Sequence, residues 1–172
     1  MHMIKQGVKW AVVLSLIISM TGFTAGRDYK YHSVFVYNFT KYIEWPGSNQ
    51  EVVIGILGNL ESANAAFKKM ADLKSSENKK FIIRNITDVN AVAGCQILFI
   101  PEQESSKLAD YLPKLQGKPI LVITEREGLI KKGSCINFVT IDGKLNIELN
   151  RSAIDQAGLK VSGQLLALAI LV

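Results

Sequence analysis

The sequence predicts an α/β fold in which a mostly parallel sheet is flanked by helices on both faces, with an antiparallel hairpin near the C-terminal end. Three observations support this prediction. Short apolar runs alternate with amphipathic segments, as in strands that are joined by crossover helices. The last two apolar runs instead flank Asp142-Gly143, a dipeptide that strongly indicates a tight hairpin. A wholly apolar segment then closes the chain and is predicted to form a terminal helix.

Residues 1–26 have the features of a secretory signal peptide. Lys5 and Lys9 give a positive start, residues 10–20 are apolar, and small residues precede Arg27. The apolar run is shorter than the about 20 residues that span a membrane. We therefore expect cleavage near Gly26 and one exported domain over residues 27–172, without stable membrane insertion of the mature chain. An uncleaved N-terminal anchor is the alternative.

The mature chain carries only a small positive charge. Removing Lys5 and Lys9 with the leader lowers the formal charge from +5 to +3. The remaining basic residues occur at most in pairs, such as Lys79-Lys80 and Lys131-Lys132. Domains that bind nucleic acid usually carry larger basic clusters. Together with export, this composition argues against a nucleic-acid partner.

The domain begins with an amphipathic helix that we predict over residues 31–45. Projection at 100° per residue places most of its aromatic and aliphatic side chains on one broad face. These side chains are Tyr31, Phe35, Val36, Phe39, Tyr42 and Ile43. Pro46 is expected to end the helix, because the residue before a proline is pushed out of the helical region.

The elements that follow are predicted from short apolar runs and from capping residues. The expected strands cover residues 52–57, 81–86, 97–100, 119–124, 136–140 and 145–149. Three helices are expected among them. Ser62 should cap the first, over residues 63–73, and Pro113 should close the second, over residues 104–112. Asn150 should cap the third, which begins at Arg151.

The closing segment, residues 165–172, is apolar throughout. A helix that packs on a sheet normally keeps a polar outer side, so this segment needs a cover. A second copy or a partner protein would supply it, and burial beneath the first helix is the alternative. Eight residues are too few to span a bilayer. We expect a partner or dimer surface from the first helix and this segment, comprising Val34, Tyr37, Lys41, Trp45, Leu165, Leu168 and Leu171.

Two cysteines, Cys95 and Cys135, remain in the exported chain. An oxidising compartment would permit a disulfide between them, and two cysteines allow a single intrachain pairing. Each cysteine also stands just before an apolar, strand-like run. Two small, buried thiols are therefore the alternative to a bridge.

Few residues of the mature chain suggest catalysis. His32 is its one histidine and falls on the apolar face of the first helix, where a buried, hydrogen-bonded residue is more common than a catalytic base. The ligand spacings of a zinc site are missing. We therefore expect no enzymatic activity, no metal and no cofactor. A hydrolase that uses His32 and Glu125 is the weakest alternative.

One place in the sequence suits a small ligand. Glu125 and Glu127 follow the strand predicted over residues 119–124, and open α/β sheets bind ligands at the carboxyl ends of their strands. Gly58-Asn59 ends an earlier strand but lacks the spacing of known phosphate-binding loops. Solvated glutamates and a plain strand-ending turn are the simpler interpretations. An exported small-ligand-binding domain, with its site at Gly58, Asn59 and Glu125, is the alternative function.

Three segments, in order, resemble the YfiR family of small periplasmic proteins. They are YNFTKYIEWP at residues 37–46; INFV at 136–139 with DGK at 142–144 and IELN at 147–150; and GLKVS at 158–162 before LLALA at 165–169. The resemblance covers almost the whole mature chain. It implies a non-catalytic periplasmic α/β domain that is often dimeric.

The resemblance also implies a function. In the characterised branch, the domain binds the periplasmic part of an inner-membrane diguanylate cyclase and holds it inactive, which places it in cyclic di-GMP signalling. Those relatives support their fold with disulfides and have more cysteines than the two found here. We therefore predict a regulatory binding protein that docks on a membrane signalling protein and restrains it.

Overall fold

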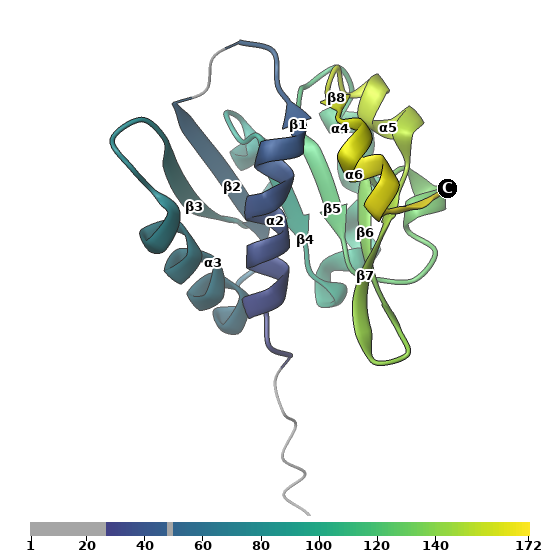
Figure 1. Cartoon of the computed structure of the whole chain (residues 1–172), viewed down its shortest axis with the longest axis horizontal. Helices are drawn as coiled ribbons and strands as arrows, with labels where there is room; N and C mark the ends of the chain where they lie inside the picture. Colours follow the sequence, from purple (N-terminus) through teal and green to yellow (C-terminus); the bar gives the residue numbers. More distant parts are fainter. Residues whose placement is uncertain (1–26, 48–49) are drawn as a thin grey trace, which may run out of the picture.

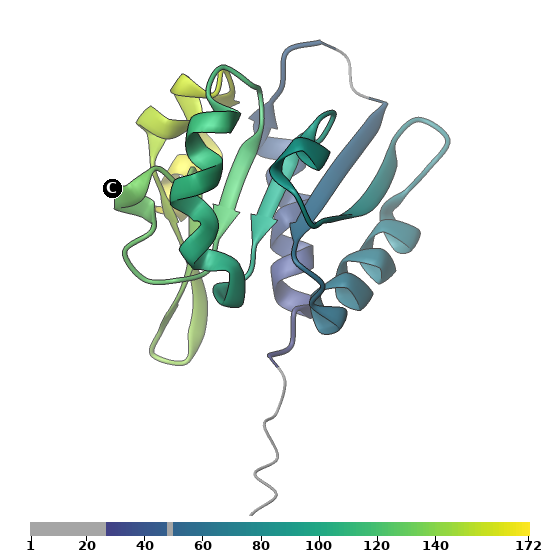
Figure 2. The same cartoon turned by 180° about the vertical axis from the view of Figure 1, so that it is seen from behind.

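The computed structural model describes residues 27–47 and 50–172. The predicted signal peptide lies outside the described residues. A seven-stranded sheet with the order β3-β2-β4-β5-β6-β7-β9 forms the centre (Figure 1). Helices α2, α3 and α6 cover one face of this sheet, and α4 covers the other (Figure 2). The structure thus confirms the predicted α/β fold.

The main strands are β2 (Glu51–Leu57), β3 (Lys80–Ile86), β4 (Ile97–Ile100), β5 (Leu121–Thr124), β6 (Ile136–Ile141), β7 (Lys144–Leu149) and β9 (Ile170–Leu171). A second, two-stranded sheet pairs β1 (Ile43–Glu44) with β8 (Lys160–Val161). The helices are α2 (Lys30–Tyr42), α3 (Glu61–Lys74), α4 (Leu108–Leu115), α5 (Arg151–Gln156) and α6 (Gly163–Leu168). Short 3-10 helices are η1 (Val89–Val92), η2 (Glu102–Lys107) and η3 (Ile130–Lys132).

The first five strands in spatial order, from β3 to β6, are parallel, and β6 and β7 form the antiparallel hairpin. Every residue of β4 and β5 is buried. Burial on both faces explains why these strands appear in the sequence as continuous apolar runs. The predicted hairpin turn is confirmed, because Asp142 and Gly143 have φ angles of 51° and 72°, which a two-residue type I′ turn requires.

An aromatic cluster joins α2 and α3 to the sheet. Phe39 of α2 stacks on Phe138 of β6 with ring centroids 6.0 Å apart. Phe67 of α3 lies 5.1 Å from Phe99 of β4. These four rings are almost wholly buried. Rings of this size contribute much of the buried apolar area of a core, so this cluster holds the front helices against the sheet.

The first helix ends at Tyr42, three residues before the predicted end at Trp45. The chain then turns into β1, where Ile43 pairs with Val161 of β8. The backbone N–H of Ser162 also donates to the Tyr42 carbonyl at 2.8 Å. Pairing with a distant segment therefore replaces the last turn that the local apolar pattern predicted.

The terminal apolar helix is present but shorter than predicted. Helix α6 ends at Leu168, and Ile170 and Leu171 form a strand parallel to β7. The backbone N–H of Val172 donates to the Leu149 carbonyl at 3.0 Å. The outer side of β7 offers unpaired backbone groups, and the end of the chain satisfies some of them as β9. The hairpin is therefore not the edge of the sheet.

Of three further predicted helix boundaries, two are wrong and one is confirmed. Ser62 lies inside α3, whose N-cap is Leu60. Pro113 lies inside α4, which continues to Leu115 although a proline removes one intrahelical hydrogen bond. Asn150 caps α5 as predicted, because its side chain accepts a hydrogen bond from the Ala153 N–H at 3.0 Å.

Candidate functional site

Two helices with exposed apolar side chains lie side by side on one face of the sheet (Figure 1). On α2, Tyr31 and Val34 are 63% and 43% exposed. On α6, Leu168 is 73% exposed. We call this set of three residues the α2–α6 face. The chain continues past α6 into the exposed residues Ile170, Leu171 and Val172, which we call the C-terminal edge.

The predicted partner residues fall into three environments. Val34, Leu168 and Leu171 are exposed, so they are available to a partner. Leu165 is 3% exposed and belongs to the core, which corrects its assignment to a surface: it is the inward-facing residue of α6. Of the remaining three predicted residues, Lys41 is exposed, and Tyr37 and Trp45 are half-buried.

The side chains of these three residues already have partners within this chain. The Tyr37 ring packs edge-on against Phe81 of β3 with centroids 5.5 Å apart. The Lys41 ammonium lies 4.4 Å from the centre of the Tyr37 ring. The Trp45 indole N–H donates to the Gln96 carbonyl at 3.1 Å, which anchors the chain just after β1. Their docking role stays a prediction.

The two cysteines are free and buried in the structure. Cys95 stands before β4 and Cys135 before β6, and β5 lies between these strands. Two strand spacings amount to about 9.6 Å, beyond the about 7 Å between Cα atoms that a disulfide tolerates. The bridge that the sequence allowed is therefore not formed. Desolvation raises the pKa of Cys95, and it raises the pKa of Cys135 to about 11.

A buried carboxylate is the most constrained polar group near the sheet ends. Glu125 follows β5, and its Oε1 atom accepts hydrogen bonds from the Tyr29 hydroxyl at 2.7 Å and from the Glu102 N–H at 2.8 Å. Arg27 Nη1 lies 3.3 Å from the same oxygen. His32 Nε2 lies 3.5 Å from the other oxygen, Oε2. The start of α2 and the carboxyl end of β5 therefore meet at the Glu125 carboxylate.

Burial dominates the titration of this cluster. It lowers the pKa of His32 to about 4, and the charge of Arg27 adds to that effect. It also raises the pKa of Glu125, against the hydrogen bonds from Glu102 and Tyr29. Desolvation, with the hydrogen bond to Glu125, raises the pKa of Tyr29 as well. His32 is therefore neutral at pH 7 and can accept a hydrogen bond at one nitrogen.

Glu125 opens onto a cavity of 680 Å³ between the start of α2, the β5 end and the β6–β7 hairpin. It is lined by Arg27, His32, Glu102, Glu125, Arg126, Glu127, Phe138, Val139, Thr140, Ile141, Leu145 and Glu148. Sequence reasoning placed Glu125 at the right edge of the sheet, but the solvated interpretation is wrong for it, since it is 6% exposed. That interpretation is right for Glu127, which is exposed.

Gly58 and Asn59, the other predicted ligand residues, do not line this cavity. They follow β2, and β4 lies between β2 and β5 in the sheet. A Cβ atom at Gly58 would lie 2.6 Å from the Glu104 carboxylate, and the Asn59 side chain accepts a hydrogen bond from Asn85. The structure therefore separates the predicted ligand site into two places.

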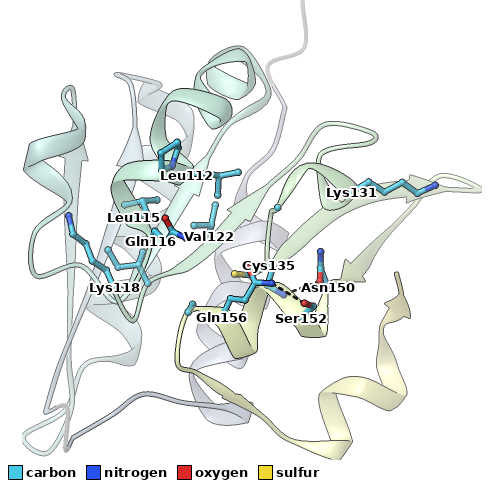
Figure 3. A pocket seen from close by; sticks show the side chains of 16 residues that line it. Leu112, Leu115, Gln116, Lys118, Val122, Lys131, Cys135, Asn150, Ser152 and Gln156 are labelled. Atoms are coloured by element: carbon cyan, nitrogen blue, oxygen red, sulfur yellow. Dashed lines mark hydrogen bonds between the residues drawn. The ribbon is translucent and has the colours of Figure 1, made fainter.

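A second cavity, of 430 Å³, lies between the end of α4 and α5 (Figure 3). Leu112, Leu115 and Val122 form its apolar side, and Lys118, Ser152 and Gln156 are among its polar residues. Cys135 is also among its lining residues (Figure 3). With its raised pKa, the Cys135 thiol is protonated at neutral pH and is a poor nucleophile. No pattern in the sequence pointed to this cavity.

Within residues 27–47 and 50–172, no group of three or more histidine, cysteine, aspartate or glutamate side chains is arranged to hold a metal ion. None of the helices that the structure describes has the length and hydropathy to cross a membrane.

Comparison with known proteins identifies the class. The sequence matches the model of the YfiR/HmsC-like family over residues 29–170, so this chain belongs to that family. Membership supports a regulatory role in the periplasm rather than a catalytic one. No curated protein matches the sequence.

One similar solved structure is a conserved domain protein from Vibrio cholerae O1 biovar eltor. It has a TM-score of 0.54 and 12% sequence identity with this chain. The match covers 83% of this chain and 59% of that one. At this identity the likeness supports the fold alone.

Proposed function

We propose that this protein is a non-catalytic periplasmic regulator that docks on a membrane signalling protein through the α2–α6 face and holds it inactive. The observation that carries this proposal is the exposure of Tyr31, Val34 and Leu168 on two adjacent helices. Large apolar side chains gain about 25 cal/mol for each Å² that a partner removes from water. Membership of the YfiR/HmsC-like family supports the regulatory part of the proposal. The partner class that fits the characterised branch of the family is an inner-membrane diguanylate cyclase.

Restraint requires differential binding. A regulator shifts a two-state partner only if it binds the inactive state more tightly than the active one. A shift from 1:99 to 99:1 needs about a 10⁴-fold difference in affinity. An apolar surface on two adjacent helices is suited to this task, because its fit depends strongly on the shape that the partner presents. Release would follow when the partner or the α2–α6 face changes conformation.

Capture from crosslinked membranes tests the proposal with matched variants. The exported, tagged protein is recovered after crosslinking, and the membrane proteins bound to it are identified by mass spectrometry. Val34→Asp and Leu168→Asp should each lower recovery of a signalling protein at least tenfold. Leu73→Asp is the control, since Leu73 on α3 is 71% exposed but lies outside the α2–α6 face.

The outcomes separate the surface from the function. Equal recovery with all three variants would contradict docking through the α2–α6 face. Recovery of no membrane signalling protein by a folded, abundant wild-type bait would contradict the regulatory docking function itself. Circular dichroism of each variant shows that it is folded.

A further inference from the structure

Two residues that line the Glu125 cavity each carry a buried polar atom with no hydrogen-bond partner among the described residues. These atoms are Glu125 Oε2 and His32 Nδ1. Both residues are 6% exposed, and both line the 680 Å³ cavity. Buried polar atoms in native proteins are nearly always paired. The unpaired Glu125 Oε2 atom therefore offers an acceptor to a hydrogen-bonding group at this cavity.

The charges around the cavity favour a cation. Its carboxylates outnumber its guanidinium groups: Glu102, Glu125, Glu127 and Glu148 against Arg27 and Arg126. Arg27 is already shared between Glu102, at 2.8 Å, and Glu125, at 3.3 Å. Neutral His32 adds no positive charge. An anionic ligand would meet a negative balance here, while a cation would reduce it.

Another wall of the cavity is apolar. Phe138, Val139, Ile141 and Leu145 come from the β6–β7 hairpin, which lies next to the start of α2 (Figure 1). Apolar walls with a few placed polar groups are typical of small-molecule sites, which usually measure about 300–1,000 Å³. A bare metal ion would leave this wall unused. The ligand that fits therefore has a charged end and an apolar body.

We propose that the Glu125 cavity binds a small organic ammonium ion with an apolar body. The ammonium group has three N–H donors, and one of them would bond Glu125 Oε2. The apolar body would pack on Phe138 and Leu145. This site is separate from the α2–α6 face, and the inference does not depend on the proposed docking function.

Three probes of similar size test the ligand class. Isothermal titration of the mature protein at pH 7.5 compares 2-phenylethylamine, 2-phenylethanol and phenylacetate, which are cationic, neutral and anionic. The amine should bind at least tenfold more tightly than the other two. Equal binding of the alcohol would show that only the apolar wall contributes and would overturn the proposal. Equal binding of phenylacetate, or no binding of the amine at millimolar concentration, would also overturn it.

Variants locate the site. Glu125→Gln keeps the shape of the side chain and should weaken binding of 2-phenylethylamine at least tenfold. Glu77→Gln makes the same change of charge on an exposed residue outside the cavity lining and should leave the affinity unchanged. If the first variant does not fold, Glu148→Gln, at a half-buried position of the lining, should weaken binding several-fold. An unchanged affinity in the folded cavity variant would overturn the assignment.

Discussion

Tyr31 and His32 are consecutive residues of α2 that occupy opposite environments. Tyr31 is 63% exposed on the α2–α6 face, whereas His32 is buried with its Nε2 atom 3.5 Å from Glu125 Oε2. A helix rotates by 100° at each residue, so one turn of α2 contributes to both the docking face and the cavity. A shift of α2 at His32 would carry Tyr31 with it. The proposed ligand site and the proposed partner surface are therefore mechanically adjacent.

The Tyr29 hydroxyl is predicted to stabilise the fold through Glu125. Its hydrogen bond to Glu125 Oε1 measures 2.7 Å and is buried. Tyr29→Phe should lower the free energy of unfolding by about 1.5–3 kcal/mol, because a buried carboxylate loses a donor. Tyr31→Phe removes an exposed hydroxyl two residues further along the chain. It should change the free energy of unfolding by less than about 0.5 kcal/mol. Urea unfolding of both variants measures the difference, and equal losses would contradict the prediction.

His32 is predicted to make stability depend on pH. Its pKa falls from an ordinary 6.5 to about 4 in the folded protein. The unfolded chain therefore binds the proton more readily between pH 4 and 6.5, and the native state loses stability as the pH falls through that window. Stability from this group is complete above pH 6.5. Between pH 7.5 and 5.0 the loss should amount to about 2 kcal/mol.

The contribution of Glu125 to the pH dependence of stability has the opposite sign to that of His32. The pKa of Glu125 is raised in the folded protein, so its contribution is fully present below the ordinary value of 4.5 and is lost as the pH rises through the raised value. His32→Asn removes only the histidine contribution and serves as the control. Urea unfolding at pH 7.5 and 5.0 should show a smaller loss of stability in the variant than in wild type. The same loss in both proteins would assign the pH dependence to other groups.

The strands could be predicted from the sequence because their burial is visible locally. β4 and β5 are buried at every position, so each appears as an uninterrupted apolar run. The ends of the first and last helices could not be predicted in the same way. Ile43 pairs with Val161, and Leu171 pairs with Leu149, across separations that no local pattern contains.

The candidate site could be predicted only in part, for the same physical reason. The position of Glu125 after β5 is a local feature, and it placed this residue at the ligand-binding edge of the sheet. Its burial depends on Tyr29, which is 96 residues away in the sequence. Whether its Oε2 atom is paired depends on how the His32 ring lies beside it. Neither relationship leaves a periodic signal in the chain.

The cysteines are predicted to be unreactive in the native protein. Both are buried, and burial raises the pKa of each thiol, so little thiolate is available at pH 8. A thiol reagent such as 5,5′-dithiobis(2-nitrobenzoate) should label neither Cys95 nor Cys135 in the folded, exported protein. It should label both after denaturation without a reductant. If neither cysteine is labelled in the denatured protein, a disulfide is present and the structure is contradicted.

The C-terminal edge is predicted to mediate a homodimer. β9 is the last strand of the sheet, and an outer strand presents backbone groups that a second copy can pair. Ile170, Leu171 and Val172 are also exposed apolar residues. Light scattering of the mature protein at high micromolar concentration should give about twice the monomer mass, in keeping with the two-fold interfaces that most homo-oligomers use.

Two leucine variants test this dimer. Leu171→Asp should give a folded monomer, because Leu171 is 59% exposed and its replacement places a charge at the pairing edge. Leu73→Asp is the control and should remain dimeric, since Leu73 is at least as accessible but lies on α3. Circular dichroism confirms that each variant is folded. A wild-type monomer at high micromolar concentration, or a dimer that persists in Leu171→Asp, would show that this edge does not join two copies.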